Sequence, residues 1–458
     1  MKYILNNSFS LFIVLPIIFV TIILVDDFHS KYTLITFVVI TSIIFFFLTF
    51  EFTKNIDVFV FTLIFVFTLY AMTVLPGWGV LNKNSVFVVA VLYVIWGIHK
   101  FNLDFASKKI VINSVWKIIF ILQIISLIIS ICLFNLKDFF YTYGLPKIIA
   151  YLGSAIFFGY YLPKIIEKKV ELKYLIIKGI IIAGIVSSIG GIITIFLNVN
   201  PYYSYPNSSI SFFAHVNLPS FLYTFSIPCV LYLIYFEKNN LNYFSRPILN
   251  LALILMVINM LFTFNRSGII SMFVGITFMT IFYSRKLLIG MILVIIPLSS
   301  FLLTFLITKG AGTILARLQL YTVSFEMMRS SFWGFLFGFG VESNFLLFQK
   351  IKTSNMIFDS HNYPHNGYIF FILQFGIVPL IFTLLSFVIL FSKSVKLLFQ
   401  KNSNKEIILY FSIILSVVIY SFFEDFFLFP ENFMYHLTWF FLGMLYINIK
   451  NQRRINNQ

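Results

Sequence analysis

Residues 251–282 read LALILMVINMLFTFNRSGIISMFVGITFMTIF, and Arg266 is the single charged residue among them. Two apolar runs, at residues 247–264 and 267–283, meet at the short turn that holds this arginine. A helix needs about 20 mainly apolar residues to cross the hydrocarbon core of a bilayer, although the second run is short for that length. The stretch therefore predicts two membrane helices joined by a tight turn.

The composition of the rest of the chain agrees with this interpretation. Of the 458 residues, 60% are hydrophobic and 10% are charged, whereas a soluble domain has about 25% charged residues. The apolar residues number about 275, enough for about 13 or 14 spans. This excludes a soluble enzyme, a disordered chain and a nucleic-acid-binding domain. We expect an all-α, polytopic transmembrane helix bundle of about 12–14 spans with one large extracytoplasmic loop.

Polar residues between the apolar stretches delimit fourteen candidate helices. The first is interpreted as a retained membrane helix, because Asp26 and Asp27 follow it where a signal peptide has small residues. The candidates cover residues 8–25, 31–50, 56–75, 84–99, 110–134, 147–162, 174–197, 217–236, 247–264, 267–283, 287–307, 366–392, 406–423 and 432–449.

The net charge of +16 is interpreted as an orientation signal. With the N-terminus inside, the alternate loops assigned to the cytoplasm hold 20 Lys and Arg residues, and the short outer loops hold 5. Positive charge concentrates on the cytoplasmic side of membrane proteins. We therefore expect a multi-pass protein of the cytoplasmic membrane with both termini in the cytoplasm and no nucleic-acid partner.

One loop, residues 308–365, is far longer than two neighbouring helices need, and long loops are usually functional. Within it, apolar residues recur at spacings of four and three and predict one face of a helix, with charged residues elsewhere on its surface. We expect this helix to lie in the membrane interface, and Arg317 could also face a phosphate at the membrane surface. The apolar residues are Ile314, Leu318, Tyr321, Phe325 and Met328, and the charged ones are Arg317, Glu326 and Arg329.

The segment SHNYPHNGYIFF, residues 360–371, ends this loop and begins a long apolar helix. It contains His361, His365 and Asn366. Histidine exchanges protons near neutral pH, so one placed at the mouth of a helix bundle could accept a proton from a hydroxyl group. The alternative is two surface histidines in a polar loop. They are weak candidates for a zinc site, because no cysteine and no third ligand lies nearby, and we expect no metal and no cofactor.

Three other polar positions hold candidate residues, and two of them have two interpretations each. Arg266 could bind a phosphate or diphosphate through its planar fork, or it could cap the preceding helix or reach lipid headgroups. In SFFAHVNLPSF, His215 and Asn217 stand at a predicted helix start, where Asn217 is a plausible N-cap. The third position is an outer segment that contains Glu424, Asp425 and Glu431. These carboxylates could orient an arginine, but the favoured interpretation is that they are solvated loop residues.

Taken together, FNRSG, then Arg317 with GFGVESN about twenty residues later, then HNGYIFFILQFGI resemble the O-antigen ligase and polysaccharide polymerase superfamily. The resemblance covers roughly residues 205–390. It divides the chain into N-terminal helices (1–200), a catalytic core with the outer loop (201–392), and C-terminal helices with a cytoplasmic tail (393–458). Two positions depart from the family pattern: Gln374 replaces a common Glu, and His215-Val216-Asn217 replaces Asn-Pro-Asn.

The resemblance implies a metal-independent membrane glycosyltransferase that acts on undecaprenyl-diphosphate-linked glycans at the outer face. By position, His365 would be the catalytic base and Arg266 and Arg317 would bind the diphosphate. Secondary candidates are His361, Asn366, His215, Asn217 and Arg329. The lipid bilayer is a partner, and other assembly proteins, such as a flippase and a chain-length regulator, are kept open as partners.

The favoured activity is polymerisation of repeat units into an O-antigen or capsule type of polysaccharide. It is favoured because such polymerases are generally needed and because two outer segments, 198–216 and 308–365, could hold two lipid-linked glycans. The alternatives are a ligase that transfers a finished glycan and, from another class, a lipid-linked oligosaccharide flippase or transporter. No internal repeat of the transporter kind is recognised in the chain.

Overall fold

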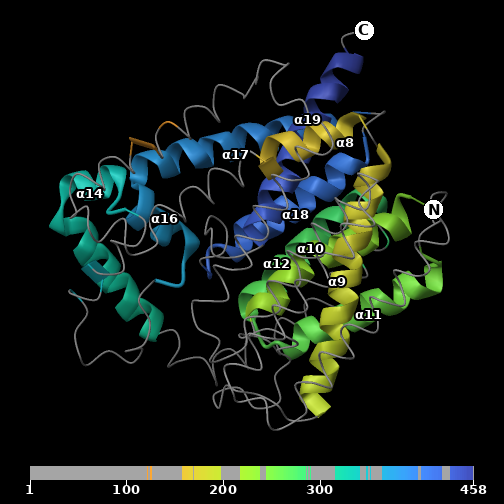
Figure 1. Ribbon diagram of the computed structural model, residues 1–458, viewed down its shortest axis with the longest axis horizontal. Helices are drawn as coiled ribbons and strands as arrows, with labels where there is room; N and C mark the ends of the chain where they lie inside the picture. The colour runs from red at the N-terminus through yellow and green to blue at the C-terminus, as the bar shows by residue number, and fades with distance from the viewer. Residues whose placement is uncertain are drawn as a thin grey trace, which may run out of the picture.

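The structure is a computed structural model, and every regular element among its described residues is helical (Figure 1). This confirms the all-α class. The described residues are 121, 124–125, 157–168, 170–196, 217–237, 244–284, 286, 289, 315–340, 347–348, 351, 364–400, 404–424 and 434–456.

Eleven of the elements in these ranges have defined bounds. They are η1 (Phe157–Tyr161), α8 (Leu162–Lys168), α9 (Val170–Phe196), α10 (Asn217–Tyr235), α11 (Arg246–Phe262), α12 (Arg266–Tyr283), α14 (Phe332–Phe337), α16 (Gly367–Phe375), α17 (Ile377–Leu398), α18 (Glu406–Tyr420) and α19 (Met434–Asn456). In addition, residues 315–330 are helical.

Helices α9 to α12 agree with the predicted spans within a few residues. Four of the described helices, α10, α12, α17 and most of α9, are long and apolar enough to cross a membrane, and α11 and α18 are shorter apolar helices. The predicted spans between residues 8 and 134, and the one at 287–307, lie almost entirely outside the described residues. The total of 12–14 spans therefore stays a prediction.

Three predicted spans have different bounds in the structure, one of which is the helix predicted at 432–449, which extends to Asn456 as α19. The predicted helix at 366–392 is divided into α16 and α17 at Gly376. Gly376 has φ 93°, which helical residues do not adopt, and Pro379 stands in the first turn of α17, where proline is tolerated. The helix predicted at 147–162 is described only from Phe157 and continues through α8 to Lys168.

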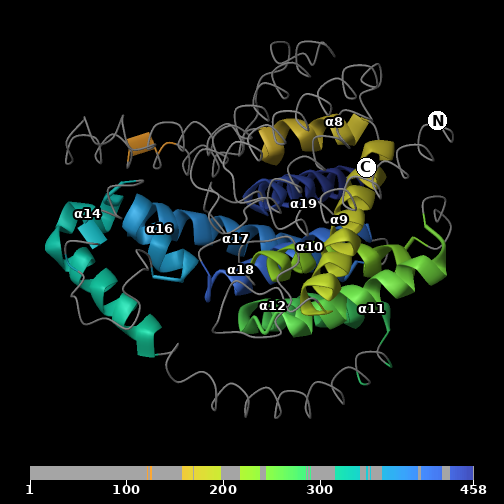
Figure 2. The same cartoon turned by 60° about the horizontal axis from the view of Figure 1, so that its bottom comes forward.

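The bundle is assembled around α10, which is almost wholly buried and contacts α9, α11, α12 and α18 (Figure 2). Helix α12 packs along α18, where a Cβ at Gly275 would lie 2.2 Å from Ser416 Oγ. Gly268 faces Ser220 of α10 in the same way, at 2.7 Å from its Cβ. Lipid supplies little hydrophobic force between membrane helices, so their association depends on close packing. Small residues such as Gly and Ser make that close packing possible.

Side-chain contacts sort the helix ends into two groups. Lys173 at the start of α9 pairs with Glu406 at the start of α18. At the other end of the bundle, the starts of α10 and α12 contact the end of α18 through Asn217, Asn265 and Tyr420. These are the groups that the alternation of loops predicts, with the second group on the outer side. Which end faces outward rests on the charge count.

The 315–330 helix, α14 and α16 form a second unit at one side of the bundle (Figure 1). The side chains packed between them include Leu320, Val323, Met327, Phe339 and Leu373. Gly338, with φ 90°, lies so close to α16 that a Cβ there would be 2.2 Å from Gln374 O. The backbone bond from Phe339 N to Leu373 O, 2.8 Å, joins the same two segments.

The predicted helix in the outer loop is confirmed over the described residues 315–330, but its inward face differs from the predicted stripe. Ala316, Leu320 and Val323 are buried, while Leu318 and Phe325 of the stripe are more than half exposed. The helix has two apolar faces, because residues 316, 320, 323 and 327 also recur at spacings of three and four. Leu318 and Phe325 of the predicted stripe therefore face away from the protein core, whereas Met328 of the same stripe is buried.

Candidate active site

Glu424 is a buried carboxylate near the starts of α10 and α12 and the end of α18, with 2% of its surface exposed. Helix α18 ends at Tyr420, and the chain then turns, with Glu424 N donating to Tyr420 O at 3.2 Å. This turn brings the carboxylate back toward the bundle. An isolated buried charge is costly, so Glu424 requires cationic or hydrogen-bonding partners.

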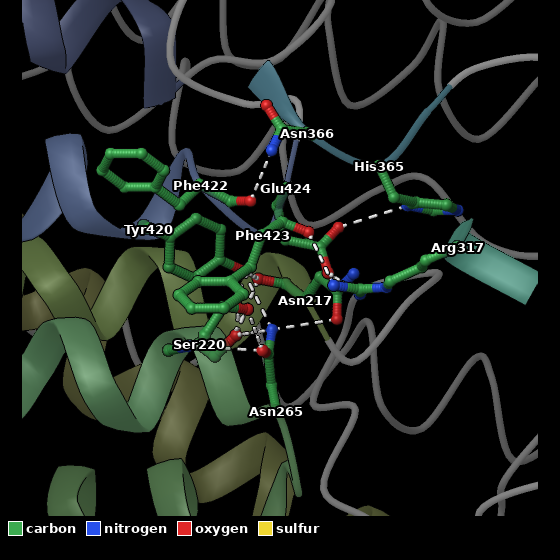
Figure 3. Close-up of polar contacts among 12 residues, drawn as sticks. Asn217, Ser220, Asn265, Arg317, His365, Asn366, Tyr420, Phe422, Phe423 and Glu424 are labelled. Carbon is green, nitrogen blue, oxygen red and sulfur yellow. Dashed lines mark hydrogen bonds and ion pairs between the residues drawn. The ribbon is translucent and has the colours of Figure 1, made fainter. Parts of the chain in front are cut away.

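Arg317 of the outer loop is the first of these partners (Figure 3). Its Nη2 donates to Glu424 Oε1 at 2.9 Å, and its Nη1 donates to Phe423 O at 3.0 Å. The arginine side chain is 31% exposed. A guanidinium carries five N–H donors, and these two contacts use two of them.

His365 is the second partner. Its Nδ1 lies 3.4 Å from Glu424 Oε2, so both carboxylate oxygens are engaged, each with a residue of the loop that precedes α16. His365 has φ 46°, in the left-handed region that residues other than glycine seldom adopt. Such backbone strain persists only where the surrounding structure over-determines it, as it commonly does at functional sites.

The residues after His365 explain how this backbone is held. Asn366 is the N-cap of α16, with Oδ1 accepting from the backbone N–H groups of Tyr368 and Ile369 at 3.0 Å each. Its Nδ2 donates to Phe422 O at 2.8 Å. Gly367 N donates to Ser421 O at 2.8 Å and to Glu424 O at 3.1 Å. The start of α16 is thus bound to the turn after α18.

The arrangement of His365 and Glu424 favours one use of the imidazole. If Nδ1 carries the proton and donates it to Glu424, Nε2 is the basic nitrogen and can accept a proton from a bound hydroxyl. A carboxylate beside a histidine fixes the ring orientation in the same way in many catalytic sites. The 3.4 Å separation is long for a hydrogen bond, and catalytic contacts are often long before substrate binds.

Arg266, the third predicted residue, is the first residue of α12. The preceding Asn265 is the N-cap, with Oδ1 accepting from Gly268 N at 3.2 Å. Phe264, one residue earlier, has φ 52°. The sequences Phe264-Asn265-Arg266 and His365-Asn366-Gly367 therefore share a local design, in which a left-handed residue precedes an asparagine cap.

The amide of Asn265 connects three helices. Its Nδ2 donates to Asn217 Oδ1 at 2.9 Å and to Ser220 Oγ at 2.7 Å, both on α10, and to Tyr420 OH at 2.9 Å on α18. Tyr420 OH in turn donates to Asn217 O at 2.9 Å. All four residues are buried, so this polar network joins the start of α12 to the end of α18, four residues before Glu424.

The structure places the predicted residues as follows. It brings His365 and Arg317 together at Glu424, and the network just described connects the turn of Arg266 to the same helix end. Asn366 and Asn217 hold helix starts in place. Arg329 is exposed and, twelve residues after Arg317, about 18 Å farther along the helix. His361 and His215 lie outside the described residues.

Gln374, which departs from the family pattern, is 1% exposed in α16, and its Nε2 has no hydrogen-bond partner in the described structure. Its backbone O accepts from Gly340 N at 3.1 Å. Among the described residues, no three His, Cys, Asp or Glu side chains gather into a group that could hold a metal ion.

Glu424 corrects the sequence interpretation of the outer acidic segment. The sequence favours solvated carboxylates there, yet Glu424 is buried and orients Arg317, which is the alternative interpretation. Asp425 and Glu431 lie outside the described residues. The signal for Glu424 in the sequence is its position directly after an apolar helix. That position does not reveal its partners, which are 107 and 59 residues away in sequence.

Comparison with known families addresses this region directly. Residues 251–384, less than a third of the chain, match a family model described as O-antigen ligase. No curated protein matches the chain. The matched residues include Arg266, Arg317 and His365, while Tyr420 and Glu424 follow the matched segment. Over these residues, the chain is therefore similar to the O-antigen ligase family.

Proposed function

We propose that the protein is a metal-independent glycosyltransferase that polymerises undecaprenyl-diphosphate-linked repeat units on the outer face of the cytoplasmic membrane. An activity of the O-antigen ligase or polymerase type follows from the family of residues 251–384. The observation that supports the choice of site is the meeting of His365 and Arg317 at the buried Glu424.

In the proposed reaction, an acceptor hydroxyl oxygen attacks the anomeric carbon of the donor glycan. The bond from that carbon to the diphosphate oxygen breaks, and the diphosphate leaves on its lipid carrier with the bonding electrons. His365 accepts the hydroxyl proton at Nε2 while Glu424 holds Nδ1. A single displacement of this kind inverts the configuration of the anomeric carbon.

The leaving diphosphate needs positive charge, which we assign to Arg266 and Arg317. Arg317 retains N–H donors beyond the two that contact Glu424 and Phe423. Glu424 then fixes the direction of the guanidinium while its remaining donors face the substrate. This proposal needs no metal ion, because the two arginines would stabilise the developing charge.

The role of His365 is tested by His365→Asn in membranes that also contain the lipid-linked glycan. Asparagine adopts the left-handed backbone conformation more readily than most residues, so this variant preserves the turn that His365→Ala would strain. We expect normal protein amounts and loss of transfer. His361→Asn is the matched control and should retain transfer. Near-normal transfer by His365→Asn would remove His365 from the role of base.

Polymerase and ligase activities are distinguished by the glycans that remain on the carrier in a deletion strain. Loss of a polymerase should leave carriers with single repeat units, whereas loss of a ligase should leave long finished chains. We expect single units. A ladder of long carrier-linked chains would make the protein a ligase. Unaltered glycan lengths with carriers retained on the inner face would instead favour a flippase.

A further inference from the structure

The buried network around Asn265 lies between two parts of the candidate site. On one side is the start of α12, which carries Arg266. On the other is the turn after α18, where Glu424 binds Arg317 and His365. Figure 3 shows the Asn265 amide directed at Ser220, Asn217 and Tyr420, beside the Glu424 group.

Tyr420 belongs to both parts. Its side-chain hydroxyl accepts from Asn265 Nδ2 and donates to Asn217 O, at 2.9 Å each. Its backbone O accepts from Glu424 N at 3.2 Å. Tyr420 therefore binds the start of α12 through its hydroxyl group and the turn that carries Glu424 through its backbone carbonyl.

We propose that Tyr420, through Asn265, is a positioning residue that sets Arg266 at the correct place relative to His365 and Arg317. The proposal rests on the proposed function, since it concerns how the two arginines reach one diphosphate. Tight positioning matters because a displacement of about 1 Å can cost about 100-fold in rate.

The chemistry of the network explains why hydrogen bonds are needed here. Helices α12 and α18 are already packed closely at Gly275 and Ser416, but apolar and small-residue packing alone leaves some freedom of rotation and sliding. Buried polar groups are costly when unpaired, so a displaced Asn265 would lose acceptors on two helices. The directional bonds from its amide therefore favour one relative placement of the helices.

The test is Tyr420→Phe, which removes the hydroxyl and keeps the ring. Asn265 Nδ2 would still have Asn217 Oδ1 and Ser220 Oγ as acceptors, and Asn217 O would still accept from Ser220 Oγ at 2.8 Å. The variant should therefore fold. The matched control is Tyr223→Phe, which removes another fully buried hydroxyl, one that contacts Ser187 and Ser188 away from the site.

We would measure kcat/KM for the lipid-linked glycan extracted from the deletion strain, using purified protein in lipid nanodiscs. Tyr420→Phe should lower kcat/KM about tenfold, and Tyr223→Phe should leave it unchanged. Introduced into an Arg266→Lys background, Tyr420→Phe should lower kcat/KM less than about twofold further, because residues that act through one another have non-additive effects.

The possible results separate this inference from the proposed function. If Arg266→Lys impairs transfer but Tyr420→Phe has no effect, or its effect is fully additive, Tyr420 is not acting through Arg266 and the inference fails alone. If Arg266→Lys has no effect, the diphosphate role of Arg266 and this inference both fail. If Tyr420→Phe does not accumulate, Ser220→Ala takes its place, because it removes another acceptor of the Asn265 amide while keeping the Cβ.

Discussion

The contact between Glu424 and His365 can be tested by a change of a single atom type, Glu424→Gln. The glutamine has the shape of the glutamate, and its Oε1 can still accept from Arg317 Nη2, which is 2.9 Å from Glu424 Oε1. Its NH₂ group then faces His365 Nδ1 as a donor. A donor in that place makes Nδ1 the acceptor, so the ring proton moves to Nε2 and Nε2 can no longer accept a proton from the hydroxyl.

The expected loss of rate follows from the geometry. A hydrogen bond to a charged group contributes about 1.5–3 kcal/mol, and the 3.4 Å separation of His365 Nδ1 and Glu424 Oε2 indicates the lower end. Reversing the donor and acceptor adds a few tenths of a kcal/mol, which gives a barrier higher by about 2 kcal/mol. That corresponds to about 30-fold in kcat.

The assay is kcat for transfer of the extracted lipid-linked glycan at saturating substrate, with protein amount and melting temperature measured in parallel. The matched control is Glu326→Gln, the same change at an exposed carboxylate on the helix that carries Arg317. The control should be unaffected. A Glu424→Gln protein of normal stability with kcat within about threefold of the parent would refute the orienting role of Glu424.

Three further predictions concern the arginine, the helix packing and the membrane. Arg317→Lys should lower kcat/KM for the same glycan about tenfold, because one ammonium group cannot reproduce the contacts of Nη1 and Nη2 with Phe423 and Glu424; full activity would restrict the arginine to a charge that orients the protein. Gly268→Ala should lower the melting temperature by an amount equivalent to about 1–3 kcal/mol, since its Cβ would lie 2.7 Å from Ser220 Cβ; an unchanged melting temperature in detergent would contradict this packing. Trp333 is 58% exposed beside Phe332 and should contact the outer leaflet, as interfacial tryptophans do. Brominated lipids should therefore quench part of the fluorescence, and Trp333→Phe should remove that part; equal quenching with and without Trp333 would place it away from lipid.

The sequence predicted the class of fold because the bilayer imposes a strong local constraint. A run of about 20 apolar residues has few alternatives to a membrane helix, so the apolar runs and the polar residues between them predict α9 to α12 within a few residues. The sequence does not predict the division of α16 from α17 at Gly376, because a single glycine in an apolar run does not indicate a positive φ angle. The number of spans and the orientation still rest on the sequence.

For the site, the sequence by itself predicts Arg266, Arg317 and His365, because their residue types and the motifs around them are local features that a resemblance can carry. Tertiary structure alone decided that Glu424 joins two of them and that Tyr420 links that group to the helix of Arg266. Glu424 and Tyr420 act through partners more than fifty residues away, and their chemistry depends on burial. A carboxylate in a solvated loop and one buried against an arginine can have the same local sequence, so only the packing of α10, α12 and α18 distinguishes the two.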